Sequence, residues 1–175
     1  RIIGLLVLLP MLYFTIKSGL WILKEYLIIF LLVCFQGFIG WYMVSSGLVD
    51  RVDVSHYRLS LHLFVAFIIL SLVFWKFLKL TNLKNNQITI KLTSLKFFLL
   101  LIFLQLIIGA FVSGMDAGKI YNTWPLMGST YFPNDSSFAE FFNLEVFDNP
   151  SIVQFVHRNL AYLIVIIYLY ILYSV

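Results

Sequence analysis

The chain has 175 residues, of which 62% are hydrophobic, 18% aromatic and only 11% charged. This balance excludes an ordinary soluble domain and predicts an integral membrane protein without a separate soluble domain. The formal net charge of +4 does not indicate nucleic acid as a partner, because the basic residues lie in particular connecting segments, where they set the orientation of membrane helices.

Apolar runs predict five transmembrane helices, since a helix needs roughly 20 mostly apolar residues to cross the ~30 Å hydrocarbon core. We expect an all-α, polytopic transmembrane helix bundle in which Pro10 kinks the first helix. The first run begins at Arg1 and the last stops at Val175, so we expect a fragment of a longer bundle. The predicted helices cover about 1–17, 25–47, 55–76, 95–115 and 150–175.

The connecting segments differ in charge, and this difference predicts the topology. Segments 17–25 and 76–96 are rich in lysine, whereas 116–148 is acidic and carries the single lysine Lys119. By the positive-inside tendency, the two lysine-rich segments are cytoplasmic. Five helices threaded in order then place 47–55 and 115–150 together on the outer side.

A repeat links two of the predicted helices. The segments QGFIGWYMVSSG from Gln36 and QLIIGAFVSGMD from Gln105 share Gln-x-x-Ile-Gly and a Ser-Gly exit. Each is followed by an outer loop and an inward-running helix that carries a histidine. The pattern predicts a duplicated helix pair, in which Gly40 and Gly109 allow neighbouring helices to approach closely.

His62 and His157 are the candidate functional residues of these helix pairs. Ser55 is a plausible N-cap and Pro150 a plausible first helical residue, and each histidine lies seven positions further on. Both imidazoles are therefore expected about 10 Å along their helices from the outer end. A histidine at this depth relays a proton, holds a polar network together or binds a metal, and is a functional candidate by default.

Arginines accompany both histidines and favour a haem ligand. Arg58 lies one helical turn outward of His62, and Arg158 directly follows His157. An iron porphyrin combines an apolar macrocycle, an iron that accepts imidazole nitrogen, and two propionates that prefer water or cations. We therefore predict His62 and His157 as metal ligands and Arg58 and Arg158 as further cofactor-binding residues.

Three other side chains have different interpretations. His56 falls at the outer edge of its helix, where a solvated or interfacial role is expected. Gln154, one turn outward of His157, is a candidate partner that fixes the imidazole tautomer. Cys34, the single cysteine, is interpreted as a small buried apolar residue.

Three segments, in this order and spacing, resemble the haem A synthase family of bacteria and mitochondria: GWYMVSSGLVDRVDVSHYRLSLHL, GAFVSGMDAGKIYNTWPLMG and QFVHRNLAY. The resemblance covers nearly the whole chain. It implies eight transmembrane helices in two four-helix halves with two histidines each, so that 1–175 is one transmembrane domain fragment, with 1–76 in the first half and 95–175 in the second. It also implies the activity, which is oxidation of a methyl group of haem O to a formyl group to give haem A for cytochrome c oxidase.

The resemblance also implies roles for individual residues. His62 is the second histidine of the first half, associated with the substrate haem O, and His157 is an axial ligand of a bound haem b. Their partner histidines are expected before Arg1 and after Val175. The family's catalytic glutamate is expected before Arg1 as well, so no catalytic residue is assigned within the chain. The paired outer cysteines of another branch of the family are not found in this sequence.

The expected surroundings and partners follow from this resemblance. They are the bacterial plasma (inner) membrane or the mitochondrial inner membrane, membrane lipid, the haem O substrate, an unidentified electron-transfer partner, and contacts with haem O synthase and cytochrome c oxidase assembly factors. Two alternatives stay open at this point. One is a di-haem b-type electron-transfer subunit that acts on quinone, and the other is a transporter or assembly scaffold without enzymatic activity.

Overall fold

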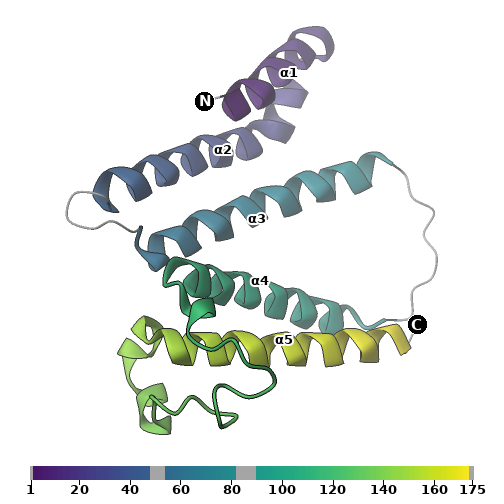
Figure 1. Cartoon of the computed structure of the whole chain (residues 1–175). Coiled ribbons are helices and arrows are strands. Elements are labelled where there is room, and N and C mark those ends of the chain that lie inside the picture. The colour runs from purple at the N-terminus through teal and green to yellow at the C-terminus, as the bar shows by residue number, and fades with distance from the viewer. Residues whose placement is uncertain (1, 48–53, 82–89, 174–175) are drawn as a thin grey trace.

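The computed structural model describes residues 2–47, 54–81 and 90–173, and in these ranges the chain is almost entirely helical (Figure 1). This confirms the predicted all-α fold class. The α-helices are α1 (Ile2–Ser18), α2 (Leu20–Gly47), α3 (His56–Leu80), α4 (Leu92–Gly114) and α5 (Pro150–Tyr173), and the short 3-10 helices are η1 (Ala117–Lys119), η2 (Phe138–Phe142) and η3 (Leu144–Asp148).

Two helices are longer than predicted. α2 begins at Leu20 rather than near 25, because Gly19 turns the chain with a φ of +101° directly after α1. α3 continues to Leu80 rather than 76, and the Nζ of Lys76 lies 5.5 Å from the centroid of the Tyr26 ring on α2. Lysines at these ends remain helical because their long side chains can follow the helix surface toward water.

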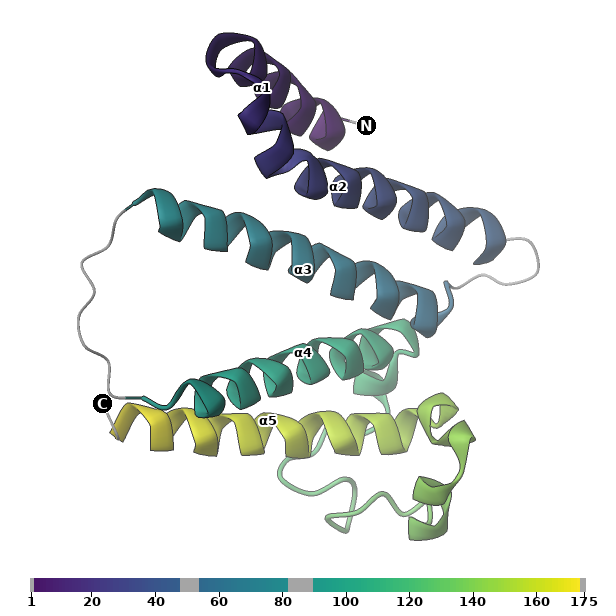
Figure 2. The ribbon, with the colours of Figure 1, turned by 180° about the vertical axis from the view of Figure 1, so that it is seen from behind.

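Each helix packs against the next one along the chain, and Figures 1 and 2 show the resulting row from α1 to α5. Many large apolar side chains on the helices remain exposed, which suits lipid surroundings. Among the described residues, Tyr26–Ser45 of α2 and the whole of α3, α4 and α5 are long and apolar enough to cross a membrane, whereas α1 is an apolar helix of 17 residues. The chain is an integral membrane protein.

The helix ends that were predicted to face outward lie together on one side of the row, at the left in Figure 1, and this side is called the outer side. They are the end of α2, the start of α3, the end of α4 and the start of α5. α5 begins at Pro150, as predicted, and Asn149 Oδ1 accepts the backbone N–H groups of Ser151 and Ile152. Ser55 occupies the N-cap position of α3 but makes no side-chain capping hydrogen bond. Lys84, one of the lysines of the predicted inner segment, lies outside the described residues.

Gly114 brings α3 and α4 together at the outer end. A Cβ atom added to Gly114 would lie 2.8 Å from both Cα and Cβ of His56, which is closer than real Cβ contacts. The first residue of α3 therefore packs directly against the last residue of α4. This contact fixes the spacing between the pair α2–α3 and the pair α4–α5.

We expect Gly114→Val to destabilise the full-length protein by about 1–3 kcal/mol, because the new side chain has to push α3 away from α4. Thermal unfolding in detergent measures this change. Gly118→Ala is the matched control, since its nearest neighbour is Val112 Cγ1 at 3.8 Å. Equal unfolding temperatures for Gly114→Val and wild type would show that the helices do not touch there.

Candidate functional site

His62 and His157 occupy equivalent places on α3 and α5. His62 is six residues beyond the first residue of α3, and His157 is seven beyond the first residue of α5. At 1.5 Å per residue, both rings lie about 10 Å from the outer helix ends. The structure confirms that the two histidines lie at similar distances from the ends of their helices, and each ring faces the helix that precedes its own in the chain.

Each imidazole packs against a glycine of the preceding helix. A Cβ added to Gly40 of α2 would lie 3.2 Å from His62 Cε1, and one added to Gly109 of α4 would lie 3.1 Å from His157 Cε1. The sequence pointed to these glycines as sites of close helix approach. The structure shows that the close neighbour is the histidine ring, so any side chain at either position would have to displace it.

A glutamine one turn before each glycine contacts the same histidine. Gln36 Nε2 donates to the backbone oxygen of His62 at 2.8 Å, and Gln105 Nε2 donates to that of His157 at 3.2 Å. Gln105 Nε2 also lies 3.3 Å from His157 Nε2. Sequence reasoning recorded these glutamines as part of the repeat but did not connect them with the histidines.

Each site keeps buried polar atoms that have no partner in the protein. These atoms are Nδ1 of His62 and His157 and Oε1 of Gln36 and Gln105. An unsatisfied polar group within a membrane span is unfavourable by several kcal/mol. Two matched sets of such atoms therefore point to a bound group that contacts the imidazoles.

A cavity of about 690 Å³ adjoins His62 between α1, α2 and α3. This volume falls in the usual range for small-molecule sites. Much of its wall consists of small residues, and the lining is Ile3, Gly4, Val33, Cys34, Gln36, Gly37, Gly40, His62, Ala66 and Ile69. Cys34, predicted to be buried, is instead exposed and contributes to this wall. A Cβ on Gly4 or Gly37 would meet nothing within 4 Å, so the glycines leave open space for a flat, apolar ligand.

No three His, Cys, Asp or Glu side chains come together as a metal centre within the described ranges. A single imidazole per site could relay a proton, join a polar network, or supply one bond to a metal that is already held by another ligand. A porphyrin iron fits this requirement, because the macrocycle provides its four equatorial nitrogens.

The guanidinium of Arg158 forms hydrogen bonds with the outer loop. Its Nη2 donates to the backbone oxygen of Tyr121 at 2.6 Å, and its Nη1 donates to those of Thr123 at 2.8 Å and Leu126 at 3.4 Å. The loop thus lies along α5 beside the residue that follows His157. A propionate-binding role for Arg158 stays a prediction.

Arg58 is placed differently from Arg158. Its guanidinium carbon lies 4.9 Å from the centroid of the Tyr42 ring, a distance typical of a cation–π contact. It remains one turn outward of His62 on α3, as the sequence predicted.

The expected contact between Gln154 and His157 was wrong. Gln154 is almost fully buried, and its Nε2 donates to the backbone oxygen of Tyr121 at 2.9 Å. The side chain turns toward the loop, where the carbonyl of Tyr121 accepts a hydrogen bond from Gln154 as well as one from Arg158. His157 has Gln105 of α4 as its amide neighbour instead.

His56 has an interfacial position, as predicted. Its Nε2 lies 3.2 Å from Asp148 Oδ1, an ion-pair distance without hydrogen-bond alignment, and its side chain is 15% exposed. Tyr57 donates to the other oxygen of Asp148 at 3.1 Å, and the His56 ring meets Phe111 edge-on. This cluster joins the start of α3 to the segment before α5 and lies apart from His62.

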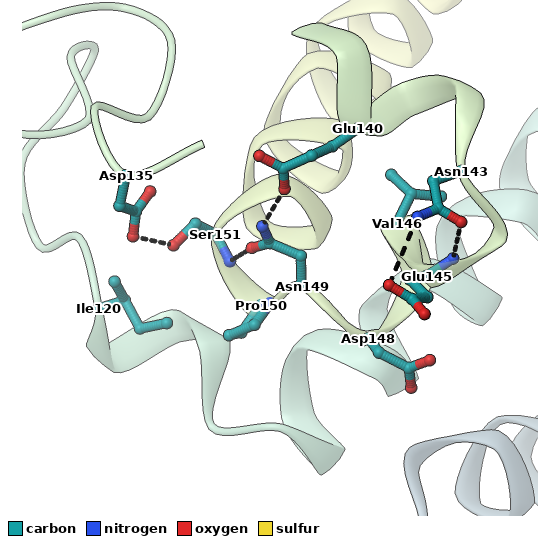
Figure 3. Close-up of a pocket in the computed structure, with 10 residues that line it drawn as sticks. All are labelled: Ile120, Asp135, Glu140, Asn143, Glu145, Val146, Asp148, Asn149, Pro150 and Ser151. Carbon is teal, nitrogen blue, oxygen red and sulfur yellow. Dashed lines mark hydrogen bonds between the residues drawn. The ribbon is translucent and has the colours of Figure 1, made fainter. Parts of the chain in front are cut away.

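The acidic part of the outer loop forms a hydrogen-bonded cup at the start of α5 (Figure 3). Ser151 Oγ donates to Asp135 at 2.7 Å, and Asn149 Nδ2 donates to Glu140 at 2.7 Å. Burial opposes ionisation of Asp135, but hydrogen bonds from Ser151, Tyr121 and Ser136 outweigh it and hold its pKa below the ordinary value. The backbone N–H of Ser137, followed by the Asn149 amide, lowers the pKa of Glu140.

These lowered pKa values predict that acid releases the loop from α5. A carboxylate with a lowered folded-state pKa contributes stability above its ordinary pKa, and this contribution disappears as the pH falls through the folded value. We expect amide protection of 135–151, corrected for intrinsic exchange, to be constant from pH 7 to about 5 and to fall below about pH 4. Asp135→Asn should reduce the protection at neutral pH, whereas Asp116→Asn, which removes an exposed pair with Lys119, should not. Unchanged protection at pH 3 would contradict this assignment.

The fold and the site together define a polytopic helical membrane protein that repeats a Gln, Gly and His constellation in two consecutive helix pairs. The chain belongs to the family of cytochrome oxidase assembly proteins, which it matches over residues 1–175. None of the solved structures matches it.

Curated relatives agree with this assignment. The chain is 51% identical to the "Heme A synthase" of Pelagibacter ubique over 166 residues, which is 94% of the chain and 49% of that protein. It is 42% identical over 178 residues to the protein of the same name from the Wolbachia of Brugia malayi, covering 95% of the chain and 52% of the relative. It is 43% identical over 169 residues to the "Heme A synthase" of Flavobacterium psychrophilum, covering 94% of the chain and 50% of that protein. The chain thus spans about half the length of these relatives.

Proposed function

We propose that this chain forms the central helices of a haem A synthase, a membrane haem-dependent oxidoreductase. The enzyme would oxidise the methyl group of haem O to a formyl group and so supply haem A for cytochrome c oxidase. The observation that carries the proposal is the matched environment of His62 and His157, each with a buried ring nitrogen that has no protein partner. Membership of the cytochrome oxidase assembly family and the names of the relatives support the particular reaction.

The two histidines would serve different haems. His157 would be an axial ligand of haem b, and His62 would face haem O from the wall of its cavity. When bound, haem supplies a redox-active iron at each imidazole. The protein's part is to present a ring nitrogen, to orient the ring against glycine, and to exclude water with an apolar wall.

The small residues around His62 support binding of a flat ligand there. Gly4, Gly37 and Ala66 line the cavity, and side chains of ordinary size at these positions would fill the space that a macrocycle needs. Haem O also carries a long isoprenoid tail, which partitions into lipid. A cavity between membrane helices is therefore a suitable place to receive this substrate.

The outer residues would act on the polar edge of the ligand and on access to it. Arg58 lies toward the membrane surface from His62, where a propionate can meet both the guanidinium and water. Arg158 and Gln154 hold Tyr121 of the outer loop against α5. This would keep the loop over the outer end of the His157 site.

The wider assembly is part of the same proposal. We infer an eight-helix protein in which 1–76 belongs to the first half and 95–175 to the second, located in a bacterial plasma membrane or the mitochondrial inner membrane. Haem O synthase, oxidase assembly factors and an electron-transfer protein would be its partners. The catalytic glutamate and the other histidine of each half would be supplied by the remainder of such a protein.

Pigment analysis of the full-length protein tests this function. We expect a pyridine haemochrome spectrum of haem b and extraction of haem A or its hydroxymethyl precursor from cells that supply haem O. His157→Ala should remove haem b and abolish formyl haem, whereas Tyr173→Ala, a control at an exposed side chain near the inner end of α5, should change neither. Purified protein without haem would reject the proposal. Bound haem that is never modified would favour the electron-transfer alternative.

The arginines give a second, graded prediction. Arg58→Ala should weaken haem retention less than His62→Ala, because a propionate near the surface can bind water instead of the guanidinium. Arg158→Ala should likewise retain more haem than His157→Ala, but it should also expose 121–126 to proteolysis, because the three carbonyl contacts are lost. Haem content and limited proteolysis measure the two effects. Equal or greater haem loss in the arginine variants would contradict this ordering.

A further inference from the structure

The same contact geometry occurs twice in the described helices. In each outward-running helix, a glutamine precedes a glycine by four residues, so both side chains face the same neighbouring helix. The glutamine amide reaches the histidine backbone oxygen, while the glycine meets Cε1 of the ring. Each histidine is therefore held at its backbone and at its ring by one helix turn of its partner.

The orientation of both amides is determined by this contact. A backbone carbonyl only accepts hydrogen bonds, so the NH₂ group of Gln36 must face His62 and that of Gln105 must face His157. This leaves Oε1 of both glutamines buried without a partner. Exchange of the two ends would place two acceptors against each other. Each glutamine thus keeps Oε1 unpaired, and its hydrogen bond to the histidine backbone sets the orientation of the amide.

The second contact at Gln105 concerns the ring itself. Its Nε2 lies 3.3 Å from His157 Nε2, and the Gly109 position lies against Cε1, the ring atom next to Nε2. The amide and the glycine of α4 therefore contact the same edge of the imidazole. Rotation of the ring about its Cβ–Cγ bond would change both contacts.

We propose that Gln36 and Gln105 are positioning residues that fix the rotation of the His62 and His157 imidazoles, and with it the orientation of the axial ligand at each iron. This inference rests on the proposed haem-binding function. Outer-shell partners of a ligating histidine orient its ring and tune the metal. Here the partner is an amide that acts through the histidine backbone and, in the second helix pair, through the ring.

Gln154 provides a matched control within the same protein. It is also buried, it also has an unpaired Oε1, and it lies one turn from His157 on α5. Its amide, however, contacts the loop at Tyr121 and not the histidine. A general effect of removing a buried amide near the site should therefore appear in Gln154 variants as well.

The test uses the full-length haem-loaded protein with Gln36→Met, Gln105→Met or Gln154→Met. Methionine keeps the length of the side chain and removes its hydrogen bonds. Low-spin EPR spectra and midpoint potentials report ligand orientation, and haem titration reports affinity. We expect Gln105→Met to shift the EPR signal and potential of the haem on His157 and to weaken its binding by about 10–100-fold. Gln36→Met should affect only the haem associated with His62, and Gln154→Met should leave both EPR signals unchanged.

Gly109→Ala is a second probe that keeps all hydrogen-bonding groups. Its methyl group would lie 3.1 Å from His157 Cε1, so it should move the same EPR signal even if Gln105→Met does not accumulate. Wild-type spectra and potentials in haem-loaded Gln105→Met and Gly109→Ala would overturn the inference. Equal shifts in Gln154→Met would overturn it too, because the effect would then be structural only. Wild-type protein without haem would instead reject the proposed function.

Discussion

The satisfaction of polar groups inside the membrane is the constraint on which the rest of this structure depends. A bilayer offers no water to an imidazole or an amide, so each must find a partner in the protein or in a bound group. Gln36 and Gln105 place their amide donors on the backbone oxygens of His62 and His157, and Gln105 also contacts the His157 ring, but each imidazole keeps a ring nitrogen without a protein partner. A haem iron would complete the environment of that ring.

The two faces of α5 separate two tasks. His157 faces α4, where Gly109 and Gln105 contact its ring. Gln154 and Arg158 face the outer loop and hold its backbone carbonyls. Ligand binding and loop attachment are therefore carried by residues only one to three positions apart. Attachment of the loop by Gln154 and Arg158 is thus separate from the support that α4 gives the His157 ring.

The sequence alone predicted the features that depend on helix periodicity and helix ends. The all-α membrane fold, the shared outer end of four helices and the equal depth of His62 and His157 follow from apolar length, loop charge and the start of α5 at Pro150. The repeat also singled out Gly40 and Gly109, but as sites of contact between helices rather than as positions against which an imidazole packs. A one-dimensional pattern cannot show which side chain fills the space left by a missing Cβ.

Interactions of the long outer loop could not be predicted in the same way. Gln154 was expected to contact His157 because the two residues are one turn apart. Its amide instead donates a hydrogen bond to the carbonyl of Tyr121. The carbonyls of the same loop accept hydrogen bonds from the guanidinium of Arg158, and the helices α2 and α3 extend beyond the bounds that their apolar runs predicted. Such choices depend on backbone carbonyls and rings that come close only after folding, so neither spacing nor composition reveals them.

A structure of the full-length protein with haem bound tests the central claim most directly. The account predicts one imidazole nitrogen of His62 and one of His157 directed at separate haem irons, at equal depth, with Gln36 and Gln105 still bonded to the histidine carbonyls. A haem held without either histidine, or either ring turned toward lipid, would contradict it.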